Sequence, residues 1–266
     1  MCLNGGVRAK SKEFTLAIAS ALVVGVGERQ GIGAAVAALL AEKGLHVYIV
    51  GRTPEKLNKR VAEIHKSGGS AQALVADSTL EADLQAVFSE IEKEGRTLDV
   101  VIYNTGRNVP SPFLQSDEVL LEDHWRRWVF GAFIVAQQSL RVMLRQKIKN
   151  GNRGTLIFTG ASASLRGKPM FSGFSAAKGG LRAMAQSIAR EFGPHGIHVA
   201  HVVIDGLVNG AIVREFGPLG RLLIKRKGDA GSLLPDEVAK SFWMLHQQSP
   251  TAWTHELDLR PYKEGF

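Results

Sequence analysis

The sequence predicts a single doubly wound α/β domain built on a seven-stranded, mainly parallel sheet. Apolar segments typical of strands alternate with segments of helical period, and no linker, repeat or low-complexity stretch interrupts them along 266 residues. A glycine-rich turn joins the first strand to the first helix. Strands that alternate with helices in this way favour a parallel sheet covered by helices on both faces.

The predicted elements follow one another in strict order. Strands are expected at residues 16–26, 46–50, 71–76, 98–104, 154–160, 198–204 and 256–259. Helices are expected at residues 31–43, from Pro54 onward, and at 81–94, 122–149, 174–192 and 235–246. Ligands of such sheets bind beyond the carboxyl ends of the strands. The polar residues that end strands should therefore line one crevice, namely Arg52, Asp77, Asn104 and Ser162.

Composition excludes several classes of protein. The one cysteine, Cys2, rules out a disulfide framework and fits a cytoplasmic setting. The formal charge of +8 comes from scattered basic residues, without an aromatic-interleaved stripe or a nucleic-acid motif. A solvated basic face is therefore favoured, and no nucleic acid, membrane or metal partner is expected. The net charge is the only feature of the sequence that favours a nucleic-acid-binding function.

The N-terminal segment imitates a secretory signal. Basic residues precede an apolar run that ends in Ala19-Ser-Ala21. The run is too short to span a membrane, and cleavage after Ala21 would remove most of the first strand. We therefore expect residues 1–14 to be a flexible tail and residues 15–266 to form the domain.

The turn after the first strand is the main candidate for a ligand site. Gly27, Gly31 and Gly33 lead into an alanine-rich helix, and the strand at 46–50 closes a βαβ unit. Backbone N–H groups at a helix N-terminus attract phosphate, and glycine lets the backbone come close to it. The sequence therefore predicts a bound dinucleotide here. An ordinary strand-to-helix turn is the alternative.

The spacing Gly27-x-x-x-Gly31-x-Gly33 resembles the TGxxxGIG turn of the short-chain dehydrogenase/reductase family, with Val26 in place of threonine. Further along, Asp77-Ser78 resembles the family's adenine-binding pair, and Asn104 and Gly106 match its NNAG stretch. The resemblance runs from about residue 18 and implies a Rossmann fold and a nicotinamide cofactor. It implies these cofactor-binding residues: Gly27, Arg29, Gln30, Gly31, Ile32, Gly33, Arg52, Asp77, Ser78, Asn104, Gly106, Lys178, Gly206 and Val208.

The end of the second strand indicates which nicotinamide nucleotide binds. The chain reads Gly51-Arg52-Thr53, without the acidic residue that would bind the ribose 2′-hydroxyl of NAD. Arg52 can pair with a 2′-phosphate, and Arg29 in the glycine turn can assist. The sequence therefore predicts NADP, with NAD the less favoured cofactor.

The catalytic half departs from the family's pattern. The family pairs a serine with Tyr-x-x-x-Lys and adds an asparagine. Lys178 matches the lysine, whereas Phe174, Ala161 and Trp128 occupy the tyrosine, serine and asparagine positions. Ser162 can replace the serine only if the turn shifts by one residue. Loss of the tyrosine should cost about 10²–10⁴ in the rate of ordinary carbonyl reduction.

Two functions stay open. The first is an NADP-dependent oxidoreductase with an atypical proton donor, acting on an unidentified small carbonyl or alcohol beneath a substrate lid at residues 207–233. The second is a catalytically silent NADP(H)-binding sensor or subunit. The family resemblance also implies a homodimer or homotetramer. Apolar residues on several faces of the two long helices support it, among them Trp125, Trp128, Phe130, Phe133 and Ile134.

Overall fold

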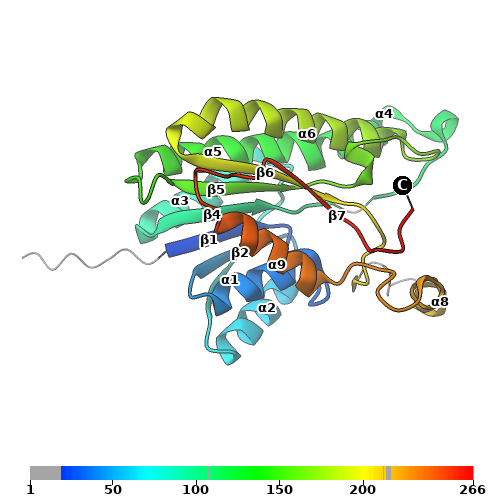
Figure 1. Cartoon of the computed structure of the whole chain (residues 1–266), viewed down its shortest axis with the longest axis horizontal. Helices are drawn as coiled ribbons and strands as arrows, with labels where there is room; N and C mark the ends of the chain where they lie inside the picture. The colour runs from blue at the N-terminus through cyan, green and yellow to red at the C-terminus, as the bar shows by residue number, and fades with distance from the viewer. Residues whose placement is uncertain (1–18, 107, 212, 214–216, 266) are drawn as a thin grey trace, which may run out of the picture.

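The computed structural model describes residues 19–106, 108–211, 213 and 217–265, so the predicted tail at residues 1–14 lies outside the described part. The strands form one sheet in the order β3-β2-β1-β4-β5-β6-β7 (Figure 1). Every neighbouring pair is parallel. The strands are β1 (Ala19–Val24), β2 (His46–Gly51), β3 (Ser70–Val75), β4 (Thr97–Tyr103), β5 (Gly154–Thr159), β6 (Ile197–Ile204) and β7 (Glu256–Leu259). The predicted fold class is confirmed.

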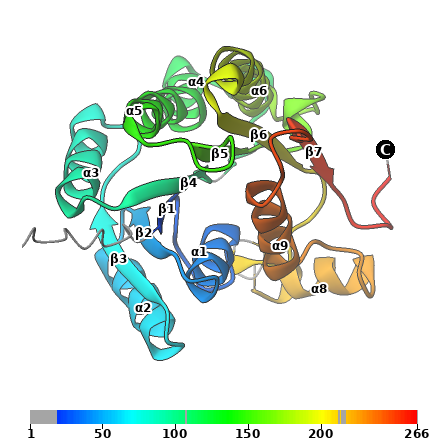
Figure 2. The ribbon, with the colours of Figure 1, turned by 60° about the vertical axis from the view of Figure 1, so that its left-hand side comes forward.

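Helices cover both faces of this sheet, as Figure 2 shows. One layer holds α1 (Ile32–Glu42), α2 (Pro54–Lys66) and α9 (Pro235–His246). The other holds α3 (Glu81–Glu94), α4 (Glu118–Trp125), α5 (Gly131–Arg145) and α6 (Ser172–Phe192). Side chains along β1 alternate between the two cores, because successive strand residues point to opposite faces. Val23 packs in the core under α1, and Leu22 in the core under α5.

The long helix predicted at residues 122–149 differs from the prediction. It begins at Glu118, because the Asp117 side chain accepts a hydrogen bond of 2.8 Å from the Leu120 N–H and caps the helix. A π-helical turn, Arg126–Phe130, separates α4 from α5. The helix ends at Arg145, where the side chain of Gln146 bonds instead to the backbone of Leu98.

Two further boundaries differ from the sequence-based expectation. The first strand ends at Val24 rather than residue 26, because Gly25 adopts φ +96° and starts the turn. The region predicted as a substrate lid, residues 207–233, contains a helix that was not expected, α8 (Gly217–Lys227), which lies at the periphery in Figures 1 and 2. Short 3-10 turns occur at Phe113–Gln115, Ser162–Ser164 and Gly193–His195.

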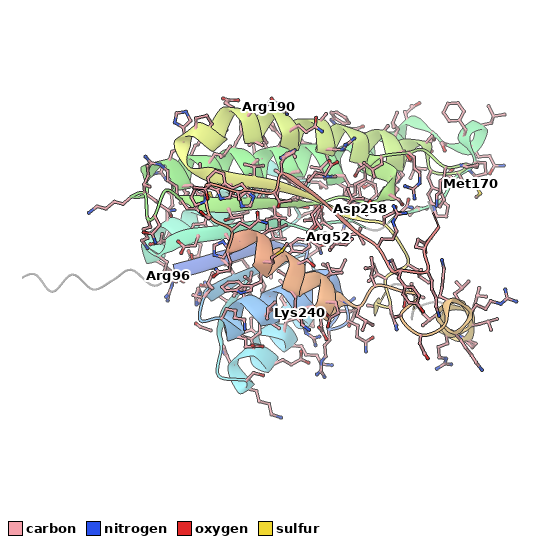
Figure 3. All side chains as sticks on the ribbon, viewed as in Figure 1. Arg52, Arg96, Met170, Arg190, Lys240 and Asp258 are labelled. Carbon is pink, nitrogen blue, oxygen red and sulfur yellow. The ribbon has the colours of Figure 1, made fainter. Side chains whose placement is uncertain are left out.

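The topology determines where a ligand can bind. β1 lies between β2 and β4 in the sheet. The chain adds β2 and then β3 on one side of β1, and afterwards crosses back to add β4 on the other side. A crevice forms beyond the carboxyl ends of strands at such a switch point. Exposed charged side chains lie on both helix layers, for example Arg190 on α6 and Lys240 on α9 (Figure 3). No helix in the described ranges has the length and apolar character to cross a bilayer.

Candidate active site

A cavity of about 540 Å³ opens beyond the carboxyl ends of the central strands. Its volume is in the range of small-molecule and cofactor sites. It brings together most of the predicted cofactor residues, namely Gly27, Gln30, Gly31, Ile32, Gly33, Arg52, Asp77, Ser78, Asn104, Gly106, Lys178 and Val208. Arg29, Gly206 and Ser162 do not line it. Arg29 instead lines a second cavity between α1, α2 and α9.

The glycine turn is shaped for an anionic ligand. Gly31 is the N-cap of α1 and has no side chain that could accept hydrogen bonds from the first turn. Gly31, Ile32 and Gly33 line the cavity, so the free N–H groups of that turn are available to an anionic ligand there. A Cβ on Gly33 would lie 2.6 Å from the Gly25 carbonyl oxygen, whereas one on Gly27 would meet nothing within 4 Å. The protein itself thus requires Gly33. At Gly27 the space around the backbone is open, so a ligand can approach it closely.

Gly25 is a part of this turn that sequence reasoning missed. It adopts φ +96°, and a Cβ there would lie 2.0 Å from the carbonyl oxygen of Asn104. Asn104 holds the turn from the neighbouring strand, with its N–H donating to Val24 O at 2.8 Å. The available signal was the glycine itself, placed directly after an apolar strand.

Charged pairs surround the end of the cavity beyond β2. Arg52, which follows β2 (Figure 3), has Nη1 3.6 Å from Asp77 Oδ2. Lys56, in the first turn of α2, has Nζ 2.9 Å from Glu28 Oε1. The hydrogen bond and charge of Lys56 hold the pKa of Glu28 below its ordinary value. Sequence reasoning missed Lys56 and Glu28; a lysine four residues after Arg52 was the only signal.

Asp77 is positioned by its own neighbours. Its N–H donates to Asp83 Oδ2 at 2.8 Å, and Thr79 donates to its Oδ1 from both backbone and hydroxyl. Burial alone would raise the pKa of Asp77, but the Thr79 hydrogen bonds and the Arg52 charge leave it below its ordinary value. The carboxylate is therefore ionised and fixed at the cavity wall.

The opposite end of the cavity holds Lys178 between two aromatic rings. The side chain comes from α6, is 5% exposed, and donates from Nζ to the Thr159 carbonyl oxygen at 2.8 Å. Nζ lies 5.6 Å from the ring centroid of Trp128 and 6.0 Å from that of Phe174. Burial lowers the pKa of Lys178 to about 7. The amine therefore exists in both protonation states near neutral pH.

Trp128 is the residue that the family resemblance aligns with the active-site asparagine. It lies in the π-helical turn, a feature frequent at functional sites. Its Nε1 donates to Thr105 O at 2.7 Å, and its ring is 4.8 Å from that of Phe174 in an edge-on arrangement. Gly106, at φ +105°, makes room for the indole, because a Cβ there would lie 1.9 Å from Nε1. The two rings therefore form an apolar wall beside Lys178.

Ala161, which the family resemblance aligns with the catalytic serine, lines the cavity, whereas Ser162 begins a 3-10 turn and does not line it. Behind Ala161, the Ser164 hydroxyl accepts from the Ala161 N–H at 3.2 Å and lies 3.3 Å from His201 Nε2. His201 Nδ1 lies 3.6 Å from Glu256 Oε2, and Glu256 binds Arg182 through two hydrogen bonds. Sequence reasoning missed this array.

This array supports the cavity wall from behind. A Cβ on Gly160 would lie 2.3 Å from His201 Nε2, so the imidazole packs directly against the backbone that lines the cavity. His201 is fully buried, and burial lowers its pKa to about 4. It is therefore neutral at physiological pH. Nothing in the sequence marked it, because His201 and Glu256 lie on strands far from Ala161 in the chain.

The segment after β6 closes over the glycine turn. Asp205 is 2% exposed and binds Arg166 at 2.9 and 3.0 Å, with Arg260 as a second partner. Farther on, Val208 pairs with Leu233, and the Ala211 N–H donates to Gln30 O at 3.2 Å. Gly206, at φ +156°, packs against Pro261 instead of the cavity.

Comparison with known proteins agrees with this geometry. The family model for short chain dehydrogenase matches residues 20–219. A glucose 1-dehydrogenase of Gluconobacter oxydans (strain 621H) is 32% identical over 193 residues, 72% of this chain and 69% of that protein.

Solved structures agree as well. A short-chain dehydrogenase from Rhodopseudomonas palustris is 36% identical with a TM-score of 0.75, covering 92% of this chain and 99% of the other. A variant of actinorhodin polyketide ketoreductase, crystallised with NADPH, shares the fold with a TM-score of 0.82 at 22% identity, over 94% and 98% of the two chains. With the parallel sheet, the glycine turn and the buried lysine in place, the chain belongs to the short-chain dehydrogenase/reductase family of oxidoreductases.

Proposed function

We propose that this protein is an NADP(H)-linked oxidoreductase that acts on a small carbonyl or alcohol substrate with an incomplete set of the family's catalytic groups. One observation carries the proposal: a single cavity joins the glycine turn, Arg52 and Lys56 to the buried amine of Lys178. The fit of a dinucleotide is supported by the open space at Gly27 and by the uncapped first turn of α1.

The preference for NADP is supported by sterics as well as by charge. A Cβ on Gly51 would lie 2.5 Å from Val26 O, so no acidic side chain fits at the position where NAD-binding members need one. Arg52 and Lys56 line the same end of the cavity and suit a 2′-phosphate. The actinorhodin ketoreductase variant in the comparison was crystallised with NADPH.

When bound, the nicotinamide supplies or accepts the hydride. Among the residues of this chain, Lys178 is positioned by Thr159 O to reach ribose hydroxyls or a substrate oxygen at the deep end of the cavity. Trp128 and Phe174 form an apolar wall that excludes water there. Asn104 and Gly25 hold the turn that would grip the pyrophosphate.

Fluorescence titration with NADPH and NADH tests the cofactor. We expect NADPH to bind more tightly, and tighter binding of NADH would refute the assignment. A screen of aldehydes, ketones, imines and enones with NADPH tests the reaction. Turnover of at least one class is expected, whereas silence with every acceptor would refute the oxidoreductase.

The replacements at Phe174, Ala161 and Trp128 favour a second candidate, a protein that binds NADP(H) without turnover. The discriminating result is micromolar affinity for NADPH together with no hydride transfer to any acceptor. The oxidoreductase is favoured over it because the cavity continues past the glycine turn to Lys178 and therefore has room for a substrate beyond the cofactor.

We further propose that residues 207–233 serve as the substrate lid and that the domain starts at residue 15.

We also propose a homodimer or homotetramer through the long helices, which leave Trp125 51% and Phe133 42% exposed in the single chain. Light scattering checks the oligomer, and a monomer would contradict it. A single cysteine fits a cytoplasmic setting.

A further inference from the structure

We propose that the Lys178 ammonium group itself exchanges the proton with the substrate oxygen. This inference rests on the proposed function and assigns the missing proton donor in it. The position that offers a phenol in the family is the phenyl ring of Phe174, which lines the cavity beside Lys178.

The hydrogen bonding of Lys178 leaves donors to spare. An ammonium group has three N–H donors, and the structure pairs Nζ with one acceptor, Thr159 O at 2.8 Å. Among the residues that the structure describes, no carboxylate forms an ion pair with Lys178. Nζ otherwise faces the rings of Trp128 and Phe174. At least one N–H is thus available to a ligand that enters the deep end of the cavity.

No tyrosine replaces the missing phenol. The sequence has three tyrosines. Tyr103 donates its hydroxyl to Arg127 O at 2.6 Å, and burial raises its pKa to about 12. Tyr48 is buried and donates to Glu94 at the end of α3, and Tyr262 is 76% exposed near the C-terminus. None of the three lines the cavity.

Other polar groups near Lys178 are unsuited to proton transfer. Ser162 and Ser175 do not line the cavity. The Thr159 hydroxyl is on a lining residue, but an aliphatic alcohol is too weak an acid to donate its proton near neutral pH. His201 is separated from the cavity by Gly160, and burial keeps it neutral. Among the described residues that line the cavity near Phe174, Lys178, whose pKa burial lowers to about 7, is the group whose proton affinity suits acid–base catalysis.

The chemistry balances with the nicotinamide as hydride donor. In reduction, a bound dihydronicotinamide would supply the hydride for the new C–H bond at the carbonyl carbon, and the C=O π electrons would move to oxygen. That oxygen takes a proton from the Lys178 ammonium group, which becomes a neutral amine and then recovers a proton from water. In oxidation the neutral amine accepts the alcohol proton as hydride leaves the carbon.

The variant Lys178→Arg separates this role from ribose binding. Arginine keeps the positive charge and the hydrogen-bond donors but does not release a proton near neutral pH. We expect the Kd for NADPH to stay within about 3-fold and kcat to fall at least about 10²-fold. Exposed Lys168→Arg is the matched control and should change neither quantity. Retained kcat in Lys178→Arg would overturn the proposal.

A second variant tests whether proton transfer is the step that Lys178→Arg loses. Phe174→Tyr restores a phenol, so the double variant Lys178→Arg/Phe174→Tyr should recover at least about 10-fold in kcat over Lys178→Arg alone. No recovery in a folded double variant would count against proton transfer as the lost step.

A readout without turnover completes the test. NMR titration of the Lys178 ε-amine in the intact protein should give a pKa near 7, and an ordinary lysine pKa of about 10.4 would overturn the role. Wild-type protein that binds NADPH but reduces nothing would remove the proposed function and this role together. An active Lys178→Arg variant would remove this role alone.

Discussion

The burial of Lys178 makes the stability of the protein depend on pH in a way that one substitution should abolish. Burial lowers the pKa of Lys178 to about 7 in the folded protein, while an unfolded lysine titrates near about 10.4. Between these values the unfolded chain binds more protons than the folded one. The free energy of unfolding should therefore rise with pH across this window, because proton binding by the unfolded state weakens.

The magnitude follows from the two pKa values. Integrated from about pH 7.5 to about pH 9.5, the proton difference at this one site contributes about 2.5 kcal/mol to the free energy of unfolding. Lys178→Met removes the site and keeps an apolar side chain of similar length between Trp128 and Phe174. The difference in unfolding free energy between wild type and Lys178→Met should shift by that amount in favour of wild type as pH rises.

Urea denaturation at several pH values in this window measures the effect, with the unfolding free energy taken by linear extrapolation. Other groups titrate in the same range, and comparison of the two proteins cancels their contribution. Lys168→Met, which changes an exposed lysine, is the control and should give a flat difference. A flat difference for Lys178→Met as well would refute the buried, proton-releasing amine.

The glycine turn, the cofactor preference and the missing phenol lead to three further predictions. Gly33→Ala should weaken NADPH binding at least about 10-fold by calorimetry, because its Cβ would lie 2.6 Å from Gly25 O and displace the turn. Gly167→Ala, with nothing within 4 Å, is its control, and equal binding by both variants would contradict the reasoning. Replacing Arg52 and Lys56 with alanine should raise the Kd for NADPH about 10- to 100-fold, since charge-assisted hydrogen bonds contribute about 1.5–3 kcal/mol. The Kd for NADH should stay unchanged. An equal loss of affinity for both nucleotides would argue against recognition of the 2′-phosphate. Phe174→Tyr with Ala161→Ser should increase the rate of simple carbonyl reduction in a spectrophotometric assay, and no gain would show that the pocket differs beyond those atoms.

Local patterns in the chain were enough to predict the fold and most of the residues that line the cavity beyond the sheet. The alternation of apolar strands with amphipathic helices arises from side-chain periods of 2 and 3.6, which are visible in sequence. The run Gly31-Ile-Gly33 before an alanine-rich helix likewise needs only neighbouring residues to be interpreted. Three element boundaries differed from the prediction. The strand end at Gly25 depends on the contact with Asn104, and the helix end at Gln146 depends on hydrogen bonds to Leu98. The helix start depends on the cap that Asp117 provides.

The amino-acid sequence by itself determined the parallel sheet, the glycine turn and the presence of a phenyl ring at Phe174, because each is a matter of residue type or local spacing. The tertiary structure alone determined the pKa of Lys178 and the packing behind the cavity wall. The lowered pKa of Lys178 comes from burial, to which Trp128 contributes from a helical turn far from Lys178 in the chain. The support of Gly160 by His201 comes from a neighbouring strand. Burial and proximity are sums over residues distant in the chain, and no short stretch of sequence contains them.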